Sequence, residues 1–313
     1  LVLAGFPCRV RASMNRWVLP ERYRGIPLLV FSSFLFSLMA LCTRMLSGRL
    51  SPGQVASGRF VIGLLFLAAY FPLLGRKPRY GRLSLWALRG IFGGAAVYLY
   101  FMAIDRMTVG PAVLLNSCWP IYAAIIGWLF LRERVTGPLL AGLVLTTVGA
   151  GLVMWSTMDV GASLSMGLGA WAGMGSAVLG GAAVVVVRAL RHDTDSATVF
   201  FSFCLFGLLF SLPFALQDWR PLGWDVVLPL LGVGLTSVAA QMTFTYAFGY
   251  VTAVAGGVAT QLTPAFSWVM GALLLGEPVS PLAVTGALVC VAGVLWGTGV
   301  VGRLIAPASR PAA

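Results

Sequence analysis

Residues 116–133 read NSCWPIYAAIIGWLFLRE, and 144 positions later residues 260–277 read TQLTPAFSWVMGALLLGE. Both stretches carry a proline near the start, a central glycine and a terminal glutamate around an apolar run. The same shift of 144 residues also aligns Arg44 with Arg188, and it aligns Gly90, Gly142 and Gly149 with Gly234, Gly286 and Gly293. A chain that matches itself at one fixed period contains two copies of one structural unit.

The composition predicts that both copies lie in a membrane. Hydrophobic residues make up 59% of the 313 residues, and charged residues make up only 10%. A soluble protein of this size cannot hide so much apolar surface, whereas a bilayer accepts it, at about 20 apolar residues per spanning helix. We therefore predict an all-α integral membrane protein.

Ten apolar segments of about this length follow one another with short connections, which contain turn residues such as Ser51-Pro52-Gly53. In the first copy the expected spans are 26–46, 54–74, 84–104, 109–131 and 137–156. In the second copy they are 167–189, 197–216, 226–248, 252–275 and 281–301.

The formal net charge of +12 indicates orientation in the membrane, since the basic residues lie between apolar runs and do not form a face for nucleic acid. With the N-terminus inside, 16 Arg and Lys residues fall inside and 5 fall outside. Arg89 counts with the inside group and Arg59 with the outside group. Both termini are expected in the cytoplasm, and we expect no nucleic-acid partner.

Five spans per copy is an odd number, so the second copy must enter the membrane upside down. Matching loops agree, because Leu131-Arg132-Glu133-Arg134, inside, corresponds to Leu275-Gly276-Glu277-Pro278, outside, and the two arginines are lost. We predict two inverted five-helix repeats (5+5), an arrangement typical of carriers with one shared central site.

The pattern resembles the EamA domain of the drug/metabolite transporter superfamily, ten-helix type. The resemblance is carried by Arg89-Gly90-Ile91-Phe92-Gly93-Gly94, Pro120, Leu131-Arg132-Glu133-Arg134 and their counterparts in the second half. It implies a carrier of small metabolites or drug-like solutes in the bacterial inner membrane. The expected divisions are an N-terminal tail (1–24), a first repeat (25–158), a second repeat (159–302) and a C-terminal tail (303–313).

The function expected from these features is transport by alternating access, with export as the expected direction. A passive channel or a structural membrane subunit is the alternative. An intramembrane enzyme is the weakest reading, because the single histidine, His192, lies in a connection and the acidic residues lie near span ends. We expect no catalytic residues, no cofactor and no metal site. The expected partners are a small solute and the bilayer, and the sequence also allows a homodimer.

Polar side chains inside a span are costly unless they face a cavity or a partner, so they are the candidate site residues. Asn116 and Trp119 come just before Pro120, and Thr260, Gln261 and Thr263 come just before Pro264. Because proline kinks a helix, we expect two bent helices that face each other across a cavity. The alternative is that these neighbours only satisfy the freed backbone groups.

Four further residues complete the predicted substrate-binding set: Tyr98, Gln241, Tyr246 and Trp268. Interhelical hydrogen bonding or core packing is the alternative for each of them. Three charged residues are expected to act as gate contacts or structural charges, namely Arg59, Glu133 and Glu277. For Arg59, an anion contact, an internal ion pair and snorkelling to the outer surface are all open.

Overall fold

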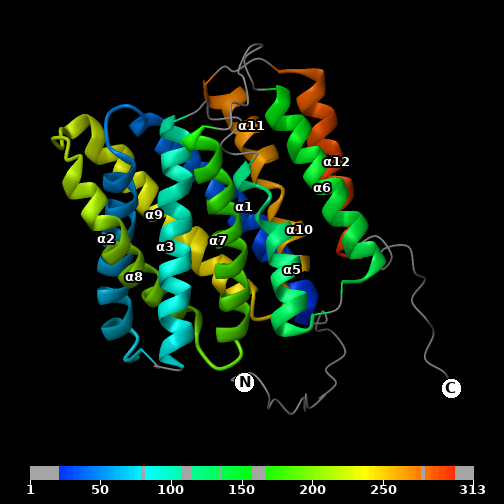
Figure 1. The fold of residues 1–313 in the computed structure, drawn as a ribbon, viewed down its shortest axis with the longest axis horizontal. Coiled ribbons are helices and arrows are strands. Elements are labelled where there is room, and N and C mark those ends of the chain that lie inside the picture. The colour runs from blue at the N-terminus through cyan, green and yellow to red at the C-terminus, as the bar shows by residue number, and fades with distance from the viewer. Residues whose placement is uncertain are drawn as a thin grey trace.

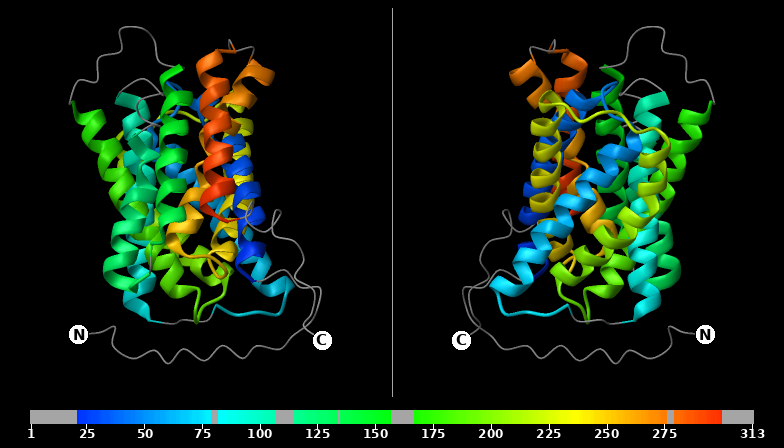
Figure 2. Two further views of the ribbon diagram at one scale, coloured as in Figure 1. Left: turned by 90° about the vertical axis from the view of Figure 1, so that its right-hand side faces the viewer. Right: turned by 90° about the vertical axis from the view of Figure 1, so that its left-hand side faces the viewer.

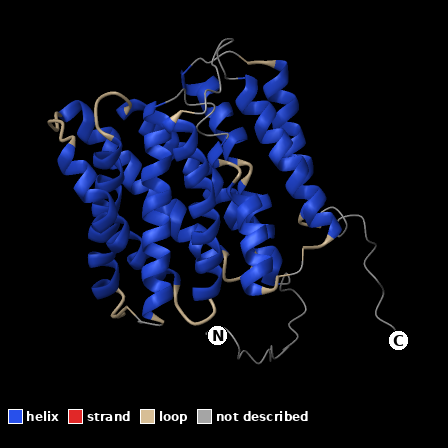
Figure 3. Cartoon of the chain, viewed as in Figure 1, coloured by secondary structure: helices blue, strands red, loops and turns tan. Residues whose placement is uncertain are grey.

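The computed structural model describes residues 21–78, 82–106, 115–133, 135–156, 167–275 and 279–299. Every regular element in this part of the chain is a helix (Figure 3), which confirms the predicted all-α class. The helices are α1 (Glu21–Leu46), α2 (Pro52–Leu73), α3 (Leu83–Arg106), α5 (Trp119–Leu131), α6 (Gly137–Ser156), α7 (Leu168–Leu190), α8 (Ser196–Gln217), α9 (Trp224–Ala247), α10 (Ala253–Thr260), α11 (Thr263–Leu275) and α12 (Pro281–Gly297).

These helices account for the ten predicted spans. Among the described residues, α1, α2, α3, α7, α8 and α9 are each long and apolar enough to cross a bilayer, and α5, most of α6 and α12 are shorter apolar helices. The ninth span differs from the continuous helix expected over 252–275, because it is divided into α10 and α11. The fourth span is described from residue 115 onward.

The two repeats run in opposite directions, as predicted. α1 starts at the lower end of Figure 1 and rises, whereas its repeat counterpart α7 starts at the upper end and descends to the connection that leads into α8. The side views in Figure 2 show the helices packed lengthwise into one bundle.

Hydrogen bonds between the repeats are themselves duplicated. The Ser32 hydroxyl of α1 donates to the Ala240 carbonyl of α9 at 2.9 Å, and the Ser176 hydroxyl of α7 donates to the Ala96 carbonyl of α3 at 2.8 Å. Ser32 is the repeat counterpart of Ser176, and Ala240 is the repeat counterpart of Ala96. The bundle therefore has a pseudo-two-fold axis that relates its halves residue by residue.

Helices of one repeat pack mainly on helices of the other. The pairs α1·α9 and α3·α7 are counterparts, as are α2·α9 and α3·α8, while α2·α8 and α6·α12 are pairs of equivalent helices. α5 and α10 belong to the equivalent fourth and ninth spans, and they also pack on each other. Contacts within a repeat, such as α2·α3 and α8·α9, are less extensive. The halves are interleaved, so neither half has a separate core.

Glycines permit the closest of these contacts, at the crossing of α6 and α12 on the right of Figure 1. A Cβ on Gly142 would overlap the Cα of Gly297 and lie 2.9 Å from the Gly293 carbonyl oxygen. A Cβ on Gly149 would lie 2.6 Å from the Gly286 carbonyl oxygen. Small residues let helix backbones approach closely in a membrane, where dispersion rather than the hydrophobic effect holds helices together.

Replacing Gly142 with alanine should destabilise the bundle, because the added methyl group meets backbone atoms that cannot move aside. We expect a loss of about 1–3 kcal/mol, measured as a lower melting temperature of the detergent-purified protein. Gly137→Ala is the matched control at the start of the same helix, where a Cβ meets nothing within 4 Å. Equal melting temperatures for the two variants would contradict close packing at this crossing.

Candidate functional site

The two proline-containing spans are interrupted at equivalent places. α10 ends at Thr260 and α11 begins at Thr263, with a turn at Gln261 and Leu262. The fourth span turns at Ser117 and Cys118 before α5 begins at Trp119. Each proline is the second residue of the helix that follows, a position where its missing N–H costs no helical hydrogen bond. The predicted kinks are thus short breaks between two helical pieces.

The carbonyl freed by Pro264 is used locally. Proline cannot donate to the residue four positions earlier, and the carbonyl of that residue, Thr260, accepts the Thr263 hydroxyl at 2.8 Å and the Ser33 hydroxyl of α1 at 3.5 Å. The Ser37 hydroxyl donates to the Thr263 carbonyl at 2.9 Å. Two serines of α1 therefore hold the carbonyls on both sides of the break, while the hydroxyls of Thr260 and Thr263 donate to carbonyls of their own span.

Glycines of other helices pack against the break in the fourth span. A Cβ on Gly181 of α7 would lie 2.8 Å from the Trp119 carbonyl oxygen and 2.7 Å from the Ala123 nitrogen. A Cβ on Gly257 of α10 would lie 2.7 Å from the Pro120 Cβ. The two interrupted spans therefore touch each other next to the break in the first of them.

Three of the predicted site residues lie on the fourth span and on α9, which meet through one aromatic contact beside this break. The Asn116 amide donates to the Ser176 hydroxyl at 2.7 Å, which links the break to α7. The Trp119 ring lies edge-on to Phe244 of α9, with 6.4 Å between centroids. Gln241 is buried one turn before Phe244, and within the described residues its side chain makes no hydrogen bond. We call Asn116, Trp119 and Gln241 together the α5–α9 site, and the contact of Trp119 with Phe244 joins its two sides.

The other predicted residues lie elsewhere. Gln261 donates to Thr147 of α6 at 3.4 Å, and Trp268 packs with Val153 of α6 and Ala283 of α12. Tyr98 stacks on Phe214 of α8 at 4.2 Å between centroids. Tyr246 is 44% exposed near the end of α9, where its hydroxyl accepts from Tyr250. The sequence could not separate these groups, because a polar residue on a helix identifies a face and not the neighbour that this face meets.

Glu133 connects three elements at the lower end of the bundle. One carboxylate oxygen lies 3.4 Å from Nε of Arg188 at the end of α7, and the other accepts from the Ala253 N–H at 2.9 Å, the first N–H of α10. Arg188 also donates to the Phe248 carbonyl at 3.1 Å. This network, which we call the Glu133 latch, ties α5 and α7 to the connection between α9 and α10. Glu277 lies outside the described residues.

Arg59 is buried between α2 and α8, with its guanidinium carbon 5.4 Å from the centre of the Phe203 ring. Arg89 of α3 lies over the same ring at 4.1 Å and is also buried. Sequence reasoning assigned Arg89 to the basic inside surface and missed its burial, because its span was expected to begin only five residues earlier.

In the part of the chain that the structure covers, no three His, Cys, Asp or Glu residues cluster as metal ligands would.

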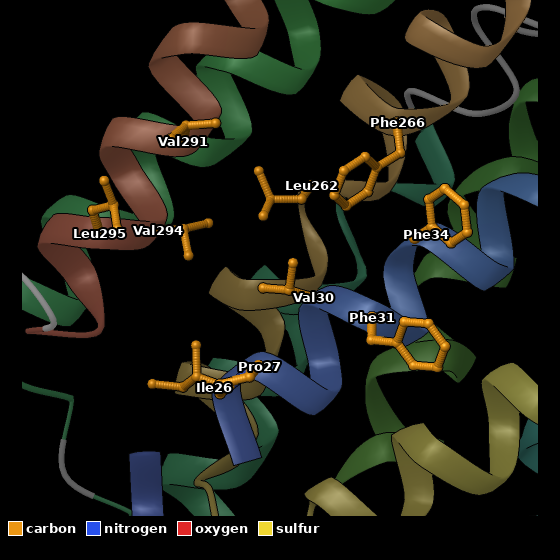
Figure 4. A pocket seen from close by; sticks show the side chains of 10 residues that line it. All are labelled: Ile26, Pro27, Val30, Phe31, Phe34, Leu262, Phe266, Val291, Val294 and Leu295. Atoms are coloured by element: carbon orange, nitrogen blue, oxygen red, sulfur yellow. The ribbon is translucent and has the colours of Figure 1, made fainter. Parts of the chain in front are cut away.

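A separate apolar groove opens between α1, the break that precedes α11, and α12 (Figure 4). Its volume is about 590 Å³, and its lining includes Val30, Phe34, Leu262, Phe266 and Val294. None of the predicted polar residues lines it. The groove therefore suits hydrocarbon and is distinct from the α5–α9 site.

Comparison with known proteins agrees with this architecture. The family model described as "EamA-like transporter family" matches residues 23–155 and again residues 167–298. A crystal structure shares the fold with a TM-score of 0.77 at 20% identity, covering 90% of this chain and 99% of that one.

Two relatives named as exporters are similar along most of the chain. The "Pseudopaline exporter CntI" of Pseudomonas aeruginosa is 24% identical, covering 85% of this chain and 93% of the relative. The "Probable terminal-alkyne amino-acid exporter" of Streptantibioticus cattleyicolor is 26% identical, covering 72% and 76%. The mouse "Solute carrier family 35 member G1" is 26% identical, covering 71% of this chain and 64% of that protein. The chain therefore belongs to the EamA-like transporter family, and it is a multi-pass membrane transporter and not an enzyme.

Proposed function

We propose that this transporter exports a small organic solute across the bacterial inner membrane by alternating access, with both termini in the cytoplasm. The observation that carries the mechanism is the pair of equivalent breaks at 117–118 and 261–262 in two spans that touch each other. Non-helical backbone at membrane depth is tolerated only where it is buried in protein or lines a cavity. The names of the two exporters among the relatives support the direction of transport.

The solute site proposed here is the α5–α9 site. Asn116 and Gln241 come from different repeats, so a solute held by both would sit at the seam between the two halves. Amide groups offer both donors and acceptors, and the Trp119 ring offers an apolar face. Gln241 supports this assignment most directly, because its amide makes no hydrogen bond with the described residues and is left for a ligand or water to satisfy.

We further propose that the Glu133 latch closes the cytoplasmic end. Both partners of the ion pair are largely buried, with side-chain exposures of 18% for Arg188 and 10% for Glu133. Opening this end must separate α5 from α7 and from the start of α10. The latch is made of hydrogen bonds and one ion pair between helix ends, contacts that can be broken and remade without rebuilding the core.

Gln241→Ala should raise the KM for transport about tenfold or more, because the variant loses hydrogen bonds to the solute. The measurement is counterflow in proteoliposomes, with a solute chosen because it raises the melting temperature of the purified protein. Thr236→Ala is the control on the same helix, since that hydroxyl donates only to carbonyls of its own helix. Unchanged saturable counterflow in Gln241→Ala would remove this residue from the site, and unsaturable flux in the parent protein would contradict a carrier.

Glu133→Gln should open the cytoplasmic end more often, because the amide keeps the shape of the side chain but loses the ion pair with Arg188. Cys118, at the break, reports the change in a variant whose other cysteines are replaced by alanine. We expect an impermeant maleimide to alkylate Cys118 about tenfold faster from the cytoplasmic side, a factor equivalent to about 1.4 kcal/mol.

Arg132→Gln is the control for this labelling experiment. It removes a neighbouring charge that takes no part in the latch. Arg132 is the residue that ends α5, in the left-handed backbone region with φ of 52°. Equal labelling rates in Glu133→Gln and Arg132→Gln would show that the latch does not control access. Faster labelling from the periplasmic side alone would contradict the proposed topology.

A further inference from the structure

Two arginine side chains are buried within the spans. Arg59 is 5% exposed and lies seven residues into α2, and Arg89 is 3% exposed and lies six residues into α3. At 1.5 Å per residue these positions are roughly 10 Å from the ends at which α2 and α3 begin. Both guanidinium groups meet at Phe203 of α8, where α2, α3 and α8 pack together (Figure 1).

No acidic side chain neutralises this pair. Neither arginine forms an ion pair or a hydrogen bond with any residue that the structure describes, and Nε of each is buried without a partner. The sequence has nine acidic residues, and none lies in the middle of a predicted span. Snorkelling does not fit the geometry either, because both charged groups lie over an interior ring and not at the molecular surface.

The Phe203 ring satisfies only part of what a guanidinium needs. A ring face attracts the cation, but the five N–H donors lie in the guanidinium plane and point past the ring. A planar fork of donors is the geometry that matches a carboxylate with two parallel hydrogen bonds. Since neither guanidinium has a hydrogen bond with the described residues, the groups that recognise an oxyanion are free.

The surrounding residues make room for these cations. A Cβ on Gly93 would overlap an Nη atom of Arg89 and would lie 2.8 Å from the Phe203 ring, so a larger residue there would displace the arginine side chain. The repeat counterparts of Arg59 and Arg89 are Phe203 and Val233, both of which are buried. The second half therefore packs the equivalent positions with apolar side chains, so the scaffold itself has no need of the two charges.

We propose that Arg59 and Arg89 bind a carboxylate group of the transported solute, at a site inside the membrane between α2, α3 and α8. The proposal rests on the transport function proposed above and adds the chemical class of the solute. The solute carboxylate supplies the negative charge that the chain lacks. The two arginines form the carboxylate site, and α9, which packs on α2, carries Gln241 of the α5–α9 site.

The binding test uses the purified full-length protein and thermal shift. The probes are L-amino acids and aliphatic carboxylic acids, each paired with its primary amide, together with sodium chloride and sodium phosphate. We expect at least one carboxylate to raise the melting temperature while its amide does not. Arg59→Gln and Arg89→Gln should each weaken the response about tenfold or more, whereas Arg106→Gln, an exposed change on α3, should not.

The ligand-free melting temperature separates binding from a structural role. Removing a buried charge that has no protein partner should leave this temperature unchanged or raise it. Arg89→Lys keeps the charge but loses the fork, so it should restore only part of the response. A lower ligand-free melting temperature in both glutamine variants, with an unchanged carboxylate response, would assign the arginines to the scaffold and overturn the site.

Two further outcomes would also overturn the proposal. One is a response to chloride or phosphate that equals the response to every carboxylate. The other is saturable counterflow of a neutral or cationic solute that is unaffected by Arg59→Gln and Arg89→Gln, which would leave the transporter proposal standing and remove only the carboxylate site. Absence of counterflow for every solute that binds would instead count against alternating access itself.

Discussion

Hydrocarbon offers no hydrogen bonds, and this constraint decides where the chain can stop being helical. A backbone N–H or C=O without a partner costs several kcal/mol there. The second interruption is therefore buried among other helices, and the first is partly buried. At the second break, hydroxyls of Ser33, Ser37 and Thr263 take up the exposed carbonyls. At the first, Gly181 brings the backbone of α7 against α5.

The duplicated architecture follows from the same packing rules. Because each helix finds its largest partner in the opposite repeat, the two halves stabilise each other and share one core. Motion in such a bundle cannot be the swing of two independent domains. It must occur by sliding and tilting at the interfaces between repeats, which are held by serine-to-carbonyl bonds and glycine contacts. Contacts at helix ends, such as that of Glu133 with Arg188, are the ones that such motion can break most readily.

Much of this architecture could be predicted from the sequence, because the period of 144 residues and the apolar runs report directly on spans and their inversion. The division of the ninth span could be predicted only as a bend, since Pro264 predicts a distortion but not where the turn falls. The grouping of site residues could not be predicted. Gln261 and Asn116 occupy similar places at their breaks, yet Gln261 bonds to α6 and Asn116 bonds to α7. Arg89 was missed because a charge near a span end resembles an anchor at the membrane surface.

The distribution of charge inside the spans has an energetic consequence. Two arginines are buried within the spans, and none of the nine acidic residues in the sequence falls in the middle of a predicted span, so the sequence offers no carboxylate there to carry protons. An anion that leaves a bacterial cell moves with the inside-negative voltage, which contributes about 2.3 kcal/mol per charge for each 100 mV. That is enough to sustain roughly a fiftyfold concentration ratio at 25 °C, since 1.36 kcal/mol corresponds to a factor of ten. For a monoanionic cargo, the resting potential alone would power efflux, and the carrier would need no coupling ion.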